Sequence, residues 1–168
     1  MRLRVQESHW EPFVEALCVR QDVETAGVIL AERIAGDILL GRELVLVPDS
    51  GYAIRQPDRI RIDPVALNRL IRPARERGLS IFTIHTHPGA REPWFSKADD
   101  IGDSVLMPSL FAQTDGPHGS LVVAGDARIP AGRAWDRPGA SKDIDIQIVG
   151  KVLRVMPGRR SERSHEWF

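Results

Sequence analysis

Apolar positions along the chain follow two spacings, one typical of helices and one typical of strands. A first helix is predicted by apolar residues at i, i+3, i+4, i+7 and i+8, namely Trp10, Phe13, Val14, Leu17 and Cys18. Ser8 and Glu11 form the signature of a capping box near its start. The apolar stripe places Cys18, the only cysteine, in the core, where we expect it to pack rather than to act as a nucleophile.

Two more helices are predicted from their start and stop signals. One spans 64–78, with a proline at its first position and a glycine at its end, and Pro73 is expected to kink or shorten it. The other begins after Ser96, which stands where an N-cap belongs, runs toward Met107 and is expected to be interrupted by Pro108.

Runs rich in β-branched and aromatic residues predict the strands. A tight turn at 35–37 joins two of them as a hairpin, and 48–57 and 113–119 are predicted loops. His118, in the second of these loops, is expected to be solvated. The expected strands are 3–5, 24–34, 38–47, 59–63, 79–84, 121–124, 128–135 and 144–155.

Length and composition indicate one globular domain. The chain has 168 residues, of which 42% are apolar and 27% are charged, enough for a hydrophobic core without disulfides or other cross-links. We expect the domain to occupy residues 1–156. The polar segment 157–168 is expected to be a flexible tail.

The charge pattern limits the partners. Lys plus Arg and Asp plus Glu each number 23, and no basic block is interleaved with aromatic residues, so nucleic acid is not an expected partner. No apolar stretch approaches the roughly 18 residues of a membrane helix. A single cysteine favours a reducing compartment, and the first residues lack the apolar core of a signal peptide. The expected location is therefore the cytoplasm.

Candidate chemistry is concentrated in the stretch 84–99. His85 and His87 leave the end of a buried strand on one face, because side chains at i and i+2 of a strand point the same way. Ser96 and Asp99 gather at the positive end of the helix that follows a short loop. Two neutral imidazoles and one carboxylate form the three-ligand set of a catalytic zinc site, whereas a structural site has four protein ligands and is typically rich in cysteine.

Each half of this pattern has an ordinary structural explanation when it stands alone. Ser-x-x-Asp is more often a capping motif than a metal site, and most isolated His-x-His pairs bind no metal. Here both halves occur in order, one at a strand end and the other at a helix start. That combination favours a metal site over the structural explanations.

The pattern resembles the JAMM motif of the JAB/MPN metalloprotease family, which has an upstream Glu, then His-x-His-Pro, a short loop and Ser-x-x-Asp. The upstream element, Glu-x-x-Gly followed by apolar residues, is matched by 24–31. Ala31 stands where many members have a second glycine, a position concerned with packing. The resemblance implies an α/β (α+β) fold, a curved mixed β-sheet flanked by helices and related to that of cytidine deaminases.

The resemblance also implies roles for individual residues. His85, His87 and Asp99 would bind one zinc ion, Glu24 would be the general base, and Ser96 would help to stabilise the oxyanion. The reaction would be hydrolysis of an amide or isopeptide bond. Because Cys18 is the only cysteine, the second zinc site found in some members is not expected.

The substrate class follows from the same resemblance. Short bacterial members resemble partners of ubiquitin-like or sulfur-carrier proteins, encoded beside activating and conjugating enzymes and sometimes in antiphage operons. The expected target is the bond after the C-terminal glycine of a ubiquitin-like protein, with its extended tail held by strand addition. The segment Leu44 to Asp63 and Trp94 are the expected substrate contacts.

Other functions stay open. The enzyme could process a sulfur-carrier protein, or the chain could be a non-catalytic binding module. The RadC branch is disfavoured, because its members resemble His-Asn-His-Pro-Ser-Gly and carry an added DNA-binding unit. This chain has His-Thr-His-Pro-Gly-Ala at 85–90 and no such unit.

Overall fold

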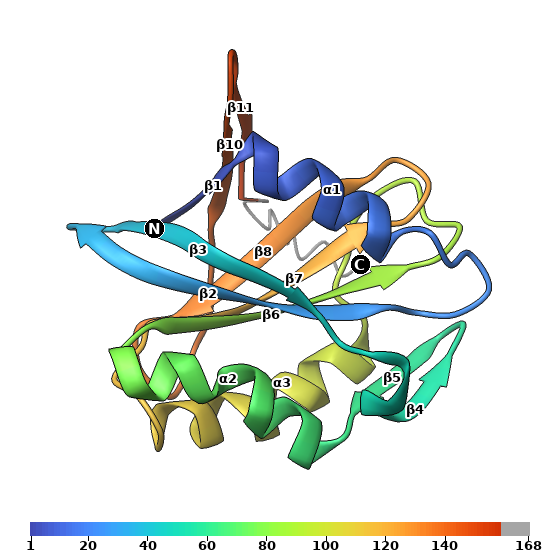
Figure 1. The fold of residues 1–168 in the computed structure, drawn as a ribbon, viewed down its shortest axis with the longest axis horizontal. Coiled ribbons are helices and arrows are strands. Elements are labelled where there is room, and N and C mark those ends of the chain that lie inside the picture. The colour runs from blue at the N-terminus through green and yellow to red at the C-terminus, as the bar shows by residue number, and fades with distance from the viewer. Residues whose placement is uncertain (159–168) are drawn as a thin grey trace, which may run out of the picture.

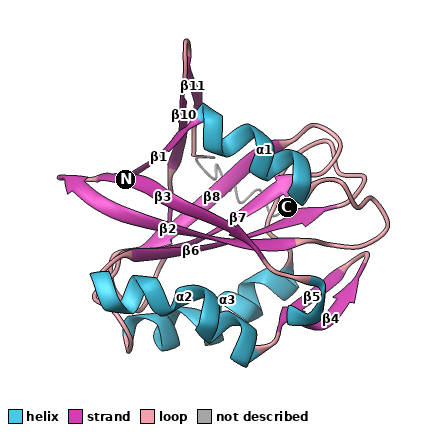
Figure 2. Ribbon diagram, in the orientation of Figure 1, coloured by secondary structure: helices cyan, strands magenta, loops and turns pink. Residues whose placement is uncertain are grey.

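The computed structural model describes residues 1–158, which form an α+β fold (Figures 1 and 2). The helices are α1 (Glu7–Leu17), α2 (Pro64–Arg77) and α3 (Lys97–Phe111), with a 3-10 turn at Asp49–Gly51. The strands are β1 (Arg2–Gln6), β2 (Ala26–Ala35), β3 (Ile38–Leu46), β4 (Tyr52–Gln56), β5 (Arg59–Ile62), β6 (Ser80–His87), β7 (His118–Ala124), β8 (Ile129–Trp135), β9 (Lys142–Asp143), β10 (Asp145–Val149) and β11 (Leu153–Met156).

Nine of the strands in this part of the chain form one sheet, in the order β11-β10-β1-β3-β2-β6-β7-β8-β9. The remaining two, β4 and β5, pair only with each other. The pairs β1–β10, β1–β3 and β6–β7 are parallel, and the other neighbours are antiparallel. The expected mixed sheet flanked by helices is confirmed.

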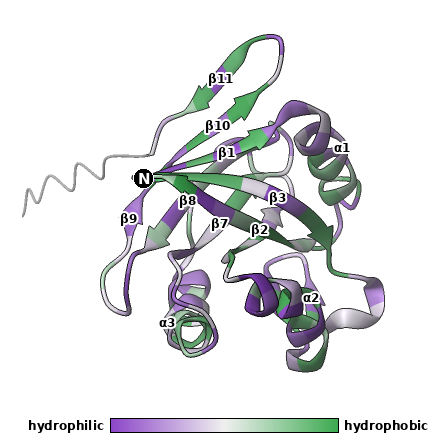
Figure 3. Ribbon diagram, turned by 60° about the vertical axis from the view of Figure 1, so that its left-hand side comes forward, coloured by the Kyte–Doolittle hydropathy of each residue, from purple (hydrophilic) through white to green (hydrophobic). Residues whose placement is uncertain are grey.

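Helices cover both faces of the sheet, with α1 on one side and α2 and α3 on the other (Figure 1). The central strand β2 is therefore apolar on both faces: Ile29 lies in the core under α1, whereas Val28 and Leu30 lie in the core under α2 and α3. In Figure 3 apolar and polar colours alternate along α1 and α2, as expected of amphipathic helices. Cys18 is buried in the α1 core, as predicted.

Two predictions about the helices are wrong. Helix α1 begins at Glu7 directly after β1 and has no side-chain cap, so Ser8 already lies in the first turn and forms no capping box with Glu11. Helix α3 is not interrupted at Pro108, since it runs to Phe111. Helix α2 runs through Pro73 to Arg77, so it is not shortened there, and the alternative of a kink stays a prediction. The apolar faces of both helices pack on the sheet, and the carbonyls that lose a hydrogen bond belong to exposed residues that water can reach.

Several strand boundaries also differ from the prediction. Strand β2 begins at Ala26, so Glu24 lies just before it. Residues 48–57 contain the 3-10 turn and β4 rather than a plain loop. The expected single strand 144–155 is the hairpin of β10 and β11, because Gly150 and Lys151 supply a turn in its middle.

His118 is not solvated but fully buried at the start of β7. Its Nδ1 accepts a hydrogen bond from the backbone N–H of Ile81 at 3.1 Å, and its Nε2 lies 3.0 Å from the carbonyl oxygen of Thr114. The ring therefore links β6, β7 and the loop after α3. Of the segment expected to be a flexible tail, residues 159–168 lie outside the described residues, so that prediction stays open.

Candidate metal centre

The two histidines lie at the end of β6, between β2 and β7, on the sheet face covered by α2 and α3. The two residues are 9% (His85) and 7% (His87) exposed, and their Nε2 atoms are 3.2 Å apart. They share a face because strand side chains alternate. The convergence predicted from the His-x-His spacing is therefore present.

Asp99 reaches these histidines from the first turn of α3. Ser96 is the N-cap: its Oγ accepts from the N–H of Asp99 at 3.1 Å, and Asp99 Oδ2 accepts from the N–H of Ser96 at 2.6 Å. This capping box turns the Asp99 carboxylate toward the strand end. Oδ1 then lies 3.0 Å from His85 Nε2, and Oδ2 lies 3.5 Å from His87 Nε2.

The three side chains fit a divalent metal ion. Their ligand atoms all lie within 4.8 Å of one another. Two nitrogens that each lie about 2.0–2.1 Å from one tetrahedral zinc ion are separated by about 3.3–3.4 Å, and the observed Nε2 separation is 3.2 Å. The donor set of two imidazoles and one carboxylate also suits zinc.

Electrostatics favour a cation at this point. Burial by itself would raise the pKa of Asp99, but the hydrogen bonds from His85 and His87 lower it overall. Burial would likewise lower the pKa of His85, but the hydrogen bond with Asp99 and the charges of Asp99 and Glu24 raise it. The same negative charges would stabilise a divalent cation between the three side chains.

Trp94 packs against the centre from the loop before α3. Its ring lies 4.7 Å from that of His87, and the side chain is 52% exposed. Nδ1 of His87 is buried and has no hydrogen-bond partner among residues 1–158. Packing by Trp94 thus contributes to the orientation of His87, while its predicted role in binding substrate stays a prediction.

Glu24 lies beside the histidines as the sequence suggested, although it is not on a strand. Ala26 pairs with His85, and the N–H of Thr86 bonds the carbonyl of Thr25 at 2.9 Å, which brings Glu24 opposite His87. Glu24 Oε1 lies 3.9 Å from His87 Nε2, and the residue is 5% exposed. Burial raises the pKa of Glu24 to about 7.

The β4–β5 hairpin holds the backbone of Glu24. The Glu24 N–H bonds the carbonyl of Gln56 at 2.9 Å, and its carbonyl accepts from Arg55 Nε at 3.0 Å. Arg55 also donates to Thr25 Oγ1 at 2.8 Å, and the hydroxyl of Tyr52 accepts from the N–H of Ala26 at 2.9 Å. No local sequence pattern predicts these contacts, because the sequence of β4 suggests a loop. The structure therefore shows that part of the segment expected to hold substrate supports Glu24, while its contact with substrate stays a prediction.

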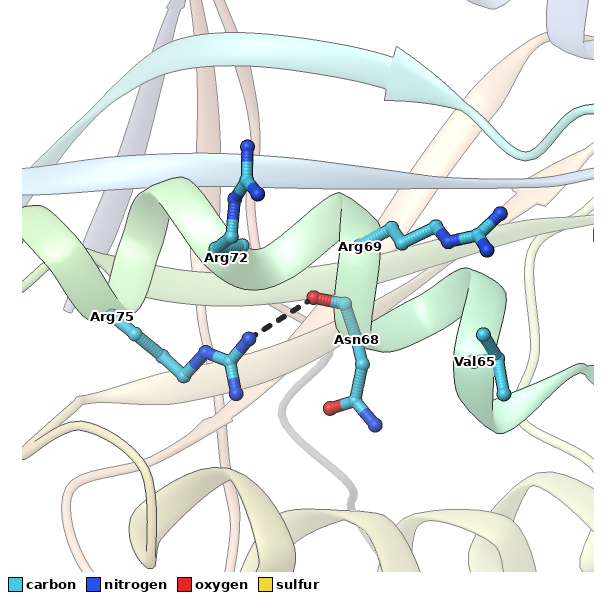
Figure 4. A pocket seen from close by; sticks show the side chains of 5 residues that line it. All are labelled: Val65, Asn68, Arg69, Arg72 and Arg75. Atoms are coloured by element: carbon cyan, nitrogen blue, oxygen red, sulfur yellow. Dashed lines mark hydrogen bonds between the residues drawn. The ribbon is translucent and has the colours of Figure 1, made fainter.

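A separate pocket on the surface of α2 contains none of these residues. Its lining is dominated by arginines, and Arg75 donates to the carbonyl of Asn68 at 3.3 Å (Figure 4). It offers no ligand set for a metal. The lining residues are Val65, Asn68, Arg69, Arg72 and Arg75.

A His-x-His pair at a strand end, an Asp in a helix capping box and a buried Glu on the adjacent segment together match the JAMM arrangement of JAB domains. A family model described as prokaryotic homologs of the JAB domain matches residues 6–138, and the chain belongs to that family.

The comparison with solved structures supports the fold but not a function. No curated protein matches the chain. The solution structure of protein DSY2949 from Desulfitobacterium hafniense superposes with a TM-score of 0.56 at 15% identity, covering 89% of this chain and 95% of that one. Within residues 1–158, none of the helices is long and apolar enough to cross a membrane.

Proposed function

We propose that the chain is a zinc-dependent peptidase or isopeptidase that cuts after the C-terminal glycine of a bacterial ubiquitin-like protein. The observation that carries this proposal is the convergence of His85, His87 and Asp99, with a buried Glu24 carboxylate 3.9 Å from His87 Nε2. Three ligands and an adjacent base form the set that metal-assisted hydrolysis requires. An ion-pair cluster serving stability alone would not need Glu24 in this position.

His85, His87 and Asp99 would hold the ion. A bound zinc ion acidifies water and polarises a carbonyl group. Glu24 takes one proton from the attacking water and returns it to the leaving nitrogen as the C–N bond breaks. Its raised pKa suits both transfers near neutral pH. The Ser96 hydroxyl, beside Asp99, donates to the carbonyl oxygen as charge develops there, a contribution of about 3 kcal/mol.

The substrate part of the proposal rests on the bacterial branch of the family. A folded protein must present a narrow extended tail to a buried centre, and Gly-Gly is the narrowest a backbone offers. The segment Leu44 to Asp63 and Trp94 would hold this tail. Activating and conjugating enzymes of the same operon, in antiphage defence or in sulfur transfer, would be its partners.

The test is a cleavage assay on a fusion of a ubiquitin-like protein to a short peptide. Cleavage after the terminal glycine is expected, and replacing the penultimate glycine by Leu should slow it strongly because the side chain collides with the enzyme. The Glu24→Gln variant, which lacks the proposed general base, is the negative control. Equal cleavage of both fusions would contradict the threaded tail. Cleavage of neither by zinc-loaded protein would favour the binding module.

A further inference from the structure

A row of buried and half-buried polar residues lies two positions before the histidines, on the same sheet face. Ser120 of β7 pairs with Thr83 of β6 on one side and with Arg133 of β8 on the other. Thr83 precedes His85 by two residues, so the side chains of both rows point toward α3. Ser120 is 3% exposed, and the Arg133 side chain is 12% exposed.

Arg133 bonds two acidic residues on the first turns of α3. Its Nε donates to Asp103 Oδ2 at 2.9 Å, its Nη2 lies 2.8 Å from the same oxygen, and its Nη1 donates to Asp100 Oδ1 at 2.5 Å. Ser120 Oγ donates to Asp103 Oδ2 at 2.5 Å. Asp103 is buried and lies one helical turn after Asp99, on the same side of the helix.

The guanidinium of Arg133 also stacks on the loop before α3. Its central carbon lies 4.0 Å from the centroid of the Phe95 ring. Phe95 stands between Trp94, which packs on His87, and the N-cap Ser96. One side chain therefore contacts both the loop and the helix that bring Asp99 to the centre.

We propose that Arg133, together with Asp103 and Ser120, is a positioning residue for Asp99. It fixes the depth and rotation of α3 on the sheet so that the Asp99 carboxylate meets His85 and His87 at ligand distance. The inference rests on the metal centre of the proposed function. It assigns Arg133 no contact with substrate or metal.

Stability alone is a weak reason for this cluster. A buried ion pair is often no more stabilising than well-packed apolar residues of similar volume, because both charges lose their hydration. Apolar residues, however, do not fix the orientation of the groups that they contact. The planar guanidinium forms several hydrogen bonds in fixed geometry and so sets the orientation of the groups that it bonds. Groups that orient metal ligands typically affect metal affinity ten- to a hundredfold.

The experiment compares Arg133→Met and Arg133→Lys with the unaltered protein. Affinity for Zn²⁺ is measured by competition with a chromophoric chelator, and the visible spectrum of the Co²⁺-loaded protein reports ligand geometry. Both variants should bind zinc about ten- to a hundredfold more weakly and show an altered Co²⁺ spectrum. Lysine keeps the charge but cannot span both carboxylates, so it should not rescue binding.

Arg154→Met is the matched control. Arg154 also joins a strand to two acidic residues of a helix, Glu7 and Glu11, but on the α1 face of the sheet. It should bind zinc like the unaltered protein. Asp103→Asn should weaken zinc binding as Arg133→Met does, and the double variant should be little worse than either one if the two residues act as a unit.

Unchanged zinc affinity and Co²⁺ spectrum in folded Arg133→Lys and Asp103→Asn would overturn the inference. These two milder variants keep the test decisive if Arg133→Met does not fold. Failure of the unaltered protein to bind either metal would instead overturn the proposed function. If the Arg133 variants lost hydrolysis but kept their metal affinity, the positioning role of Arg133 would be contradicted, while the proposed function would stand.

Discussion

The centre has two halves that are supported by different parts of the molecule. The ligand half, formed by the proposed ligands His85, His87 and Asp99, belongs to β6 and α3 and is backed by the nine-stranded sheet. The base half is the proposed general base Glu24, whose backbone is held by the separate β4–β5 hairpin through Arg55 and Gln56. An arginine supports each half, Arg133 in the first and Arg55 in the second.

The difference lies in how much structure each half depends on. The ligand half is fixed by side chains from β6, β7, β8 and α3. The base half depends on hydrogen bonds of the Glu24 N–H and carbonyl to a hairpin whose residues are half-buried or exposed. The bonds between Thr25 and Thr86 add a link to β6. Metal binding and proton transfer should therefore respond to different substitutions.

The largest effect is expected in the ligand half. His85→Ala should reduce zinc from about one ion per chain to nearly none and abolish hydrolysis, because two ligands do not hold the ion tightly. Elemental analysis of protein purified with zinc and without chelator measures this. His9→Ala, a change on α1 far along the chain from the ligands, is the control. A full zinc content in His85→Ala would exclude His85 as a ligand.

The second effect separates the halves. Glu24→Gln keeps size and polarity but cannot accept a proton, so hydrolysis should fall roughly a hundredfold or more while zinc content is unchanged. Turnover and elemental analysis on the same sample check both expectations. Glu15→Gln, an exposed residue of α1, should change neither. Loss of zinc from Glu24→Gln would make Glu24 a ligand and remove the distinction.

A smaller effect is expected from the hairpin. Arg55→Gln removes the hydrogen bonds to the Glu24 carbonyl and to Thr25 Oγ1, so the base should be displaced. We expect kcat to fall about tenfold with little change in zinc affinity. Arg72→Gln alters an exposed arginine of α2, outside the segment proposed to hold substrate, and should behave as the unaltered protein. Weakened zinc binding in Arg55→Gln would show that the halves are not independent.

The smallest effect concerns pH and the support of β6 by His118. Burial lowers the pKa of His118, so below about pH 6.5 the unfolded chain binds a proton that the folded ring does not. The free energy of unfolding should therefore fall as the solution becomes more acidic, by up to about 1.4 kcal/mol per pH unit from this group. Metal-free His118→Gln should show a flatter dependence in urea unfolding. Parallel curves for the two proteins would contradict this.

The ligand half could be predicted because its geometry is local. Residues two apart on a strand share a face, and Ser96 and Asp99 cap one helix, so spacing alone indicates His85, His87 and Asp99 as candidate ligands. The placement of Glu24 depended on the family resemblance, because its segment precedes β2.

The supporting residues could not be predicted in this way. Arg55 meets Glu24 across 31 positions, and Arg133 meets Asp103 across 30, so each contact depends on how distant elements pack. His118 was misjudged for a similar reason: glycine and proline before it suggest a loop, yet the ring fills a buried site beside Ile81. Pro73 and Pro108 end neither helix, because tertiary packing stabilises both helices beyond the prolines.

The position of β1 in the sheet bears on how the protein forms during synthesis. β1 pairs with β3 on one side and with β10 on the other, where Arg2 lies opposite Asp145. On the ribosome, one edge of β1 stays open until β10 has emerged, and an open edge can pair with other chains. Pairing across so many residues is also slow. Removing the β10–β11 hairpin should therefore lower the yield of folded protein without altering any residue of the metal centre.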